Sequence, residues 1–109
     1  MYPELSLYID GQFLRGDGRT EQDIRNPADG AVIGRLPHAT PADLDRALAA
    51  AQRAFESWKH SSSMERSRIL RRVGELTRER APDIGRGITL DQAKALAEAV
   101  GEVLRCADH

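Results

Sequence analysis

The hydrophobic pattern of this chain changes once, near residue 38, and that change limits the folds that it can adopt. Residues 1–37 contain short apolar runs separated by Gly, Pro, Asn and Asp, as in strands joined by tight turns. Residues 38–109 repeat apolar side chains every three or four positions, as amphipathic helices do. The sequence therefore predicts an α+β fold with two β-hairpins in residues 1–37, followed by three or four amphipathic helices in residues 38–109.

Two turn motifs define the predicted hairpins. In the first, Asp10-Gly11 separates the apolar runs 5–9 and 12–14 and suits a type I′ turn, which needs positive φ at both central residues. In the second, residues 26–30 join the runs 22–25 and 31–36. Pro27 fixes one dihedral angle of that turn, and Gly30 gives the backbone the freedom to leave it.

Cap signals mark the first two predicted helices. Thr40 suits an N-cap, Pro41 suits the first helical position, and Asp43 places negative charge near the positive end of the helix dipole. One face of this helix is predicted to hold Leu44, Ala47, Leu48, Ala51, Phe55 and Trp58. Ser62 and Glu65 fit a capping box for a second helix, which we expect to end near Arg80.

The last third of the chain predicts a third helix from Pro82 and a final helical stretch over 96–107. The buried side of the third helix is expected to consist of Ile84, Ile88 and Leu90. The helical pattern runs on to Asp108-His109 without a capping glycine or proline, so we expect a piece of a longer protein.

Length and charge exclude several classes of protein. At 109 residues and 12.1 kDa the chain is one domain at most, and we expect residues 1–37 and 38–109 together to form one partial domain. Its 16 basic and 17 acidic residues give a net charge of −1, which argues against nucleic acid or a membrane surface as a partner. One cysteine excludes an internal disulfide and favours a reducing, cytoplasmic setting.

Few residues are candidates for chemistry. Cys106 lies near the electronegative end of a helical pattern, which does not activate a thiol, so we interpret it as a helix cysteine packed against its neighbours. His38, His60 and His109 are isolated in sequence and have no second ligand at metal spacing. The sequence therefore predicts no catalytic and no metal-binding residue.

The second helix is rich in arginine, which has two interpretations. A nucleic-acid helix would need unopposed charge, whereas Glu65, Glu75 and Glu79 interleave with the arginines here, so we favour a solvated face. The arginines are Arg66, Arg68, Arg71, Arg72, Arg78 and Arg80. No glycine-rich phosphate loop is present in the sequence, so no cofactor-binding residue is predicted either.

Five segments, in order, resemble the NAD(P)-dependent aldehyde dehydrogenases. They are Tyr8 to Phe13, Ile24 to Gly34 with its Asn-Pro-x-x-Gly turn, Asp43 to Trp58, Glu65 to Leu70, and Ile88 to Gln92. Together they span nearly the whole chain, and within the family they are most similar to the bacterial succinate-semialdehyde type.

The resemblance implies an N-terminal segment that packs onto a doubly wound cofactor domain. In the family, the nucleophilic cysteine, the glutamate base, the oxyanion-hole asparagine and the residues that bind NAD or NADP come later in the chain. Cys106 does not match the catalytic cysteine. The resemblance thus implies an aldehyde-oxidising enzyme of which this fragment alone is not catalytic and binds no cofactor. The alternative is a truncated remnant that associates with itself, or with a protein partner, through exposed helix faces.

One departure from the family concerns backbone conformation. Ala93-Lys94-Ala95 stands where the family has Gly-Lys-Pro, a sequence that stops a helix. We expect either a strained Ala93 with positive φ, or one continuous helix from near Pro82 to Asp108.

Overall fold

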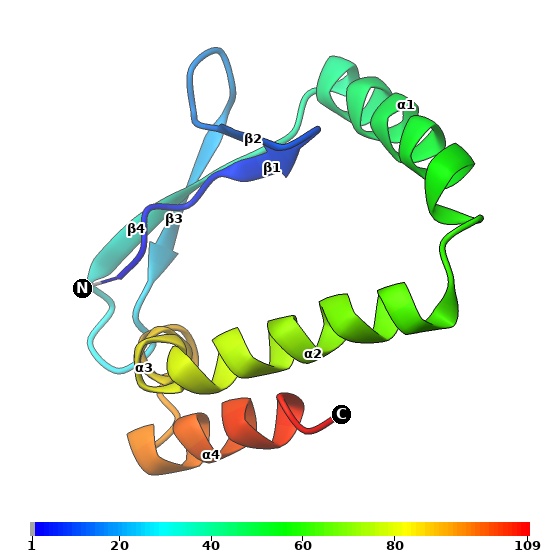
Figure 1. The fold of residues 1–109 in the computed structure, drawn as a ribbon. Helices are drawn as coiled ribbons and strands as arrows, with labels where there is room; N and C mark the ends of the chain where they lie inside the picture. Colours follow the sequence, from blue (N-terminus) through cyan, green and yellow to red (C-terminus); the bar gives the residue numbers. More distant parts are fainter. Residues whose placement is uncertain (1) are drawn as a thin grey trace. The chain divides into compact units, whose positions relative to one another are not determined.

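The computed structural model describes residues 2–109 as two hairpins followed by four helices (Figure 1). This confirms the predicted α+β class. The strands are β1 (Leu7–Ile9), β2 (Gln12–Leu14), β3 (Glu21–Arg25) and β4 (Val32–Pro37), and the helices are α1 (Pro41–Trp58), α2 (Ser63–Glu79), α3 (Ala81–Gln92) and α4 (Leu96–Cys106). Strands β1 and β2 form one two-stranded sheet, and β3 and β4 form another.

The described residues group into two compact units. One contains residues 4–24 and 34–61, and thus the first hairpin and α1; the other contains residues 2–3, 25–33 and 62–109, and thus α2, α3 and α4. The interpretation of residues 1–37 and 38–109 as parts of one partial domain stays a prediction. None of the helices in the described part of the chain combines the length and hydropathy that crossing a bilayer requires.

Both predicted turns are present. In the first hairpin, Leu7 pairs with Leu14 and Ile9 pairs with Gln12 in antiparallel register. The turn between these strands has φ of 54° at Asp10 and 75° at Gly11, the two positive values that a type I′ turn requires. In the second hairpin Gly30 has φ of 73°, and its N–H donates to the Asn26 carbonyl at 2.8 Å.

The predicted caps also form. Thr40 and Asp43 make a reciprocal capping box at α1, with Pro41 in the first turn, and Ser62 and Glu65 make another at α2. The Ser62 contacts lower the pKa of Glu65. Each box satisfies backbone N–H groups that have no partner within the helix.

Most of the predicted apolar face of α1 is exposed, and Ala47 and Ala50 are half-buried. Four alanines line a groove of about 360 Å³ against the β1–β2 turn. The larger side chains of the same face stay 46–70% exposed. The alanines are Ala47, Ala50, Ala51 and Ala54, and the exposed side chains are Leu44, Leu48, Phe55 and Trp58.

The helix pair α3 and α4 packs through its smallest side chains. An added Cβ at Gly85 would lie 2.6 Å from Val100 Cγ2 and 3.1 Å from the Val100 backbone nitrogen. Ala81 and Ala99 are buried, at 1% and 0% exposure. Glycine and alanine thus allow α4 to approach α3 closely.

This packing corrects the predicted buried side of α3. The prediction is wrong for Ile84, which is 41% exposed, while Ile88 and Leu90 are half-buried. The physical reason is that α4 approaches α3 at Gly85, where no side chain stands in the way.

The turn between α3 and α4 decides between the two alternatives for Ala93. Ala93 has φ of 53° and ψ of 22°, in the left-handed region, and its N–H donates to the Thr89 carbonyl at 2.9 Å. The continuous helix is therefore wrong for this structure, and the strained alanine is present. Because an L-residue in this region brings Cβ close to the following carbonyl, the conformation costs about 1 kcal/mol.

Two alanine substitutions in α3 should have opposite effects on stability. Gly85→Ala is expected to lower the free energy of unfolding by about 1–3 kcal/mol, because the new methyl group overlaps Val100. Gly87→Ala is the matched control, since an added Cβ there meets nothing within 4 Å. It should raise the free energy of unfolding by about 0.5–1 kcal/mol through helix propensity. Urea denaturation measures both, and equal effects would contradict the close packing at Gly85.

Restoring a helix stop at the α3–α4 turn should also stabilise the chain. Ala93→Gly removes the left-handed penalty and should add about 1 kcal/mol to the free energy of unfolding. Ala95 already has φ of −57°, within the range of proline, so Ala95→Pro should add about 0.5 kcal/mol by restricting the unfolded chain. Thermal unfolding of both variants checks this, and a destabilised Ala93→Gly variant would contradict the left-handed conformation.

Candidate functional site

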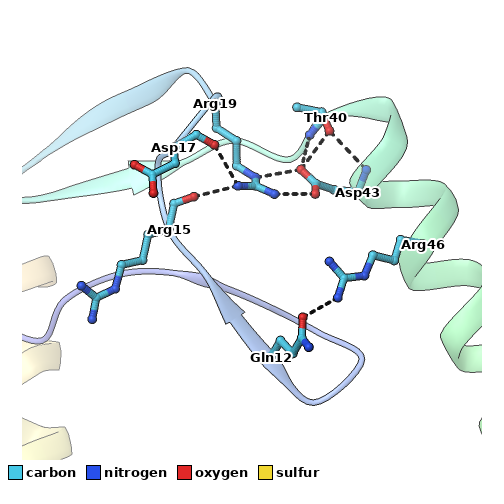
Figure 2. A network of polar contacts seen from close by, with 7 residues as sticks. All are labelled: Gln12, Arg15, Asp17, Arg19, Thr40, Asp43 and Arg46. Atoms are coloured by element: carbon cyan, nitrogen blue, oxygen red, sulfur yellow. Dashed lines mark hydrogen bonds and ion pairs between the residues drawn. The ribbon is translucent and has the colours of Figure 1, made fainter.

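A cluster of polar contacts ties the loop after β2 to the start of α1 (Figure 2). The Arg19 guanidinium faces the Asp43 carboxylate in a forked pair, with Nε donating to Oδ2 at 2.8 Å and Nη2 donating to Oδ1 at 2.6 Å. Its Nη1 donates to the carbonyls of Arg15 and Asp17. The side chains of this pair are only 15% and 8% exposed, so water screens the pair little.

Thr40 completes the cluster around the same carboxylate. Its backbone N–H and its hydroxyl each donate to Asp43 Oδ2 at 2.9 Å, while the hydroxyl accepts from the Asp43 backbone N–H at 3.2 Å. The Arg19 hydrogen bonds and the Thr40 N–H hold the pKa of Asp43 well below its usual range. Hydrogen bonds to Asp43 likewise raise the pKa of Arg19.

The role of this cluster is to hold the structure together. The three nitrogens of the Arg19 guanidinium all donate to protein oxygens, and the Asp43 carboxylate accepts from Arg19 and from Thr40. Two further contacts fasten the same hairpin to α1, from Arg46 to Gln12 at 2.6 Å and from Arg53 to Asp10 at 2.9 Å. The cluster therefore positions α1 against the first hairpin.

In the other unit, a groove of about 580 Å³ lies between α2 and the turn that follows α4. Arg78 Nη2 donates to the Ala107 carbonyl at 3.1 Å and pairs with Asp108. An added Cβ at Gly74 would lie 2.9 Å from the Ala107 oxygen, so the turn packs closely on α2. The contacts of Arg78 and Gly74 thus hold the turn after α4 against α2. It is lined by Ser63, Arg66, Ser67, Leu70, Arg71, Gly74, Arg78, Ala107, Asp108 and His109.

A tyrosine contact joins residues 2–3 to α3. The Tyr2 hydroxyl donates to Asp91 Oδ1 at 2.7 Å. Partial burial, together with this hydrogen bond and the Asp91 charge, raises the pKa of Tyr2 to about 12.

The structure does not gather the candidate residues of the sequence into a reacting set. Cys106 is free and exposed at the last residue of α4, so the prediction of a packed cysteine is wrong. It lies seven residues after the buried Ala99, on the same side of the helix, but at the last turn of α4, where it stays uncovered. His38, His60 and His109 are exposed. No group of three His, Cys, Asp or Glu side chains able to hold a metal ion occurs among residues 2–109.

Two arginines of α2, Arg72 and Arg78, form ion pairs with acidic side chains. Arg72 lies 2.9 Å from Glu75 and 3.7 Å from Glu79, and Glu75 raises the pKa of Arg72. Arg78 is held by the turn after α4. These contacts are those of a solvated face, although the prediction that the helix does not bind nucleic acid stays untested.

Comparison with known families identifies the class of protein. The model of the aldehyde dehydrogenase family matches residues 13–109. The chain belongs to the aldehyde dehydrogenase family, of which it is an N-terminal segment, and the predicted resemblance is confirmed at this level.

The relatives belong to the same family and are named for different substrates. The chain is 42% identical over 103 residues to the acylating mitochondrial methylmalonate-semialdehyde/malonate-semialdehyde dehydrogenase of Rattus norvegicus, a match that covers 94% of this chain and 19% of the relative. It is also 42% identical over 96 residues to the glutarate-semialdehyde dehydrogenase of Pseudomonas putida, covering 88% of this chain and 20% of the relative. The succinate-semialdehyde subtype is not singled out by these matches.

Solved structures match the fold closely. An NAD-dependent aldehyde dehydrogenase from Sinorhizobium meliloti matches with a TM-score of 0.91 and 31% identity, over 99% of this chain and 22% of that one. The lactaldehyde dehydrogenase of Escherichia coli matches with a TM-score of 0.89 and 37% identity, over 97% and 22%. The chain therefore spans about a fifth of the length of the relatives that it matches.

The β4–α1 junction of this segment does not have the free phosphate cradle that a nicotinamide cofactor needs. A dinucleotide phosphate is typically held by free N–H groups where a strand leads into a helix. At the β4–α1 junction, the Thr40 hydroxyl already accepts from the Asp43 N–H and the Asp43 carboxylate accepts from the Thr40 N–H, so these N–H groups are not available to a phosphate. The glycines with positive φ lie in other turns: Gly11, Gly18 and Gly30. No step of a reaction is therefore assigned to this segment.

Sequence reasoning missed the role of Arg19. Its partner Asp43 lies 24 positions away, a separation at which helix and strand periodicity carry no information. The one available signal was Asp43 itself, an acid in a capping position.

The stability of the chain should fall in acid because of Asp43. Since Arg19 and Thr40 lower the pKa of Asp43 in the folded state, its contribution is present above the unfolded pKa of about 3.9 and is lost as the pH falls below it. Asp43→Asn should lower the thermal midpoint at neutral pH, and the difference from wild type should shrink below about pH 4. Asp45→Asn, at an exposed position of the same helix, is the control. A constant difference between wild type and Asp43→Asn at every pH would contradict this role.

Proposed function

We propose that this segment belongs to an enzyme that oxidises a semialdehyde to a carboxylic acid with NAD or NADP. The observation that supports this most is the family match over residues 13–109, in a chain about a fifth as long as its relatives. Similar structures include one described as NAD-dependent and one described as NADP-dependent and complexed with NADP. The choice between the two cofactors therefore stays open.

The proposed substrate carries a carboxylate at the end opposite the aldehyde. Several relatives are named for such compounds, namely methylmalonate, malonate and glutarate semialdehydes. Succinate semialdehyde, the choice that the sequence favours, belongs to the same chemical class. In a dehydrogenase of full family length that carries this segment, we expect kcat/KM to be higher for semialdehydes than for the uncharged aldehydes of equal length.

We propose that the segment by itself is not catalytic. Cys106 lies at the C-terminal end of α4, whose dipole opposes a thiolate. The residues that the resemblance assigns to catalysis lie outside residues 1–109. A reducing, cytoplasmic setting is compatible with the exposed thiol, and we propose no membrane or nucleic-acid partner.

The remainder of a dehydrogenase-length chain is the proposed partner of the uncovered helix faces. Besides the side chains of α1, the helix α2 leaves Met64, Ile69, Leu70 and Val73 between 50% and 69% exposed. Apolar side chains clustered in this way favour association when water is their only neighbour. Self-association of the segment through the same faces is the second candidate, supported by the same exposures.

The isolated 109-residue chain should not reduce NAD or NADP. The assay follows nucleotide absorbance with succinate, malonate or glutarate semialdehyde, and a bacterial aldehyde dehydrogenase of full length serves as the positive control. Aldehyde-dependent reduction by the chain, persisting in Cys106→Ser, would contradict the assignment of catalysis to other residues.

A chimera tests whether the segment is a working part of the enzyme. Residues 1–109 replace the matching N-terminal segment of the Escherichia coli lactaldehyde dehydrogenase, with which they share 37% identity. We expect a soluble chimera that oxidises lactaldehyde. A soluble chimera without activity would contradict the proposal.

Matched variants of the chimera test the uncovered faces. Leu48→Asp places a charge in the exposed apolar stripe of α1 and should reduce solubility and activity on the order of tenfold or more. Ala49→Asp introduces the same charge on another side of the helix, at an exposed position, and should leave activity near that of the unmodified chimera. Equal activity of the two variants would show that the α1 stripe is not covered.

A further inference from the structure

Three turns of the chain contain an aspartate followed directly by a glycine. In such a pair the backbone nitrogen of the glycine can approach the carboxyl carbon of the aspartate, because no glycine side chain stands in the way. Both residues of each pair are exposed. The sequence therefore makes the pairs equivalent, and a difference between them has to come from the fold. They are Asp10-Gly11, Asp17-Gly18 and Asp29-Gly30.

In the second hairpin, hydrogen bonds hold both groups of the pair. Asp29 Oδ1 accepts from the Ala31 N–H at 2.9 Å. The Gly30 N–H donates to the Asn26 carbonyl at 2.8 Å. Each hydrogen bond that has to break lowers the population of a geometry in which the nitrogen meets the carboxyl carbon. This pair is therefore protected in the folded chain.

In the first hairpin, an ion pair and the paired strands restrain the aspartate and the glycine. Asp10 Oδ2 accepts from Arg53 at 2.9 Å. The turn of Asp10 and Gly11 is closed directly by the pairing of Ile9 with Gln12. Rotation of the peptide between Asp10 and Gly11 thus disturbs the hairpin, and we expect this pair to be protected as well.

The remaining pair lies in the loop between β2 and β3, where no hydrogen bond holds the carboxyl group. The Arg19 N–H donates to the Gly16 carbonyl at 2.8 Å and closes a turn around Asp17 and Gly18. Within residues 2–109, neither the Asp17 carboxylate nor the Gly18 N–H makes a hydrogen bond. Figure 2 shows the Asp17 carbonyl facing Arg19 while the carboxylate points away.

The restraint on the peptide between Asp17 and Gly18 is also the weakest in its cluster. Arg19 Nη1 donates to the Asp17 carbonyl at 3.2 Å, the longest of the hydrogen bonds of this guanidinium. Arg19 attracts the Asp17 carboxylate electrostatically without bonding to it. The reacting groups of this pair are therefore the least restrained of the three.

We propose that Asp17-Gly18 is a site of spontaneous aspartate isomerisation. The Gly18 nitrogen attacks the protonated Asp17 carboxyl group and forms a new N–C bond. The carboxyl O–H leaves as water with the hydrogen of the Gly18 N–H, which gives a five-membered imide. Hydrolysis takes up one water: opening at the side-chain carbonyl restores aspartate, and opening at the backbone carbonyl gives isoaspartate. Nothing is oxidised or reduced, and water is the only co-reactant.

The product loosens the cluster that positions α1. Isoaspartate adds one carbon to the backbone of the loop from which Arg19 reaches Asp43. The carbonyls of Arg15 and Asp17, which accept from Arg19 Nη1, lie in the same loop and are displaced. We therefore expect the isomerised chain to unfold at a lower temperature. This reaction does not depend on the proposed enzymatic function.

The test compares the three pairs within one sample of the 109-residue chain, incubated for weeks at neutral pH and physiological temperature. Trypsin, which cuts after arginine, places each pair on its own peptide. Chromatography separates the isomers, and electron-transfer fragmentation identifies isoaspartate. Isoaspartate should accumulate at Asp17 on the order of tenfold faster than at Asp29 or Asp10, because fewer contacts have to break. Equal rates at the three pairs, or a faster rate at Asp29 or Asp10, would overturn the proposal.

Unfolding the chain is the control for the role of the structure. In concentrated urea the hydrogen bonds of the three turns are lost, so the three rates should become similar. A preference for Asp17 that is as large in urea as in buffer would show that the fold does not select this pair, and would overturn the argument.

A matched variant tests the effect on the cluster. Asp17→Ser removes the carboxyl group and keeps a residue that is common in turns. The thermal midpoint of this variant should stay constant during the incubation, whereas that of wild type should fall as isoaspartate accumulates at Asp17. An incubated wild type that contains isoaspartate at Asp17 and keeps its thermal midpoint would contradict the link to Arg19.

Discussion

The chain has little buried apolar area, and the rest of its structure depends on that limit. The buried hydrophobic core of the described part consists of Ile9, Ala81, Ala99 and Val103, and two of these are alanines that bury only a methyl group. Hydrogen bonds and ion pairs at the ends of helices and strands therefore contribute much of what holds these elements in place. The forked pair of Arg19 and Asp43 is the clearest example, because it is shielded from water and fixes the start of α1.

The small buried apolar area is also related to the chain's being a segment of a larger family member. The segment covers about a fifth of its relatives' length, and its exposed apolar side chains are in contact with water. They include Leu44 and Leu48 of α1 and Met64, Ile69, Leu70 and Val73 of α2. Within the segment, small residues rather than large ones make the helix contacts, as at Gly85 with Val100 and at Gly74 with Ala107. Small residues thus make the close contacts inside the segment, while its larger apolar side chains stay exposed.

Local sequence signals predicted the elements well because the interactions behind them are short in range. The two turns need positive φ at residues such as Gly11 and Gly30, and the two capping boxes join residues three positions apart. The candidate site was less predictable. Arg19 meets Asp43 across 24 positions, and the exposure of Cys106 depends on where its helix ends relative to its neighbours.

The sequence by itself determined the class of fold, the helix starts, the turns and the family, since each rests on a pattern of a few neighbouring residues. Only the tertiary structure decided which faces are covered and how the chain passes from α3 to α4. Alanine at residue 93 favours a helix by local preference, and the packing of Val100 on Gly85 requires a bend. The contact between helices outweighed the preference of one residue, because it combines the burial of several side chains against a penalty of about 1 kcal/mol.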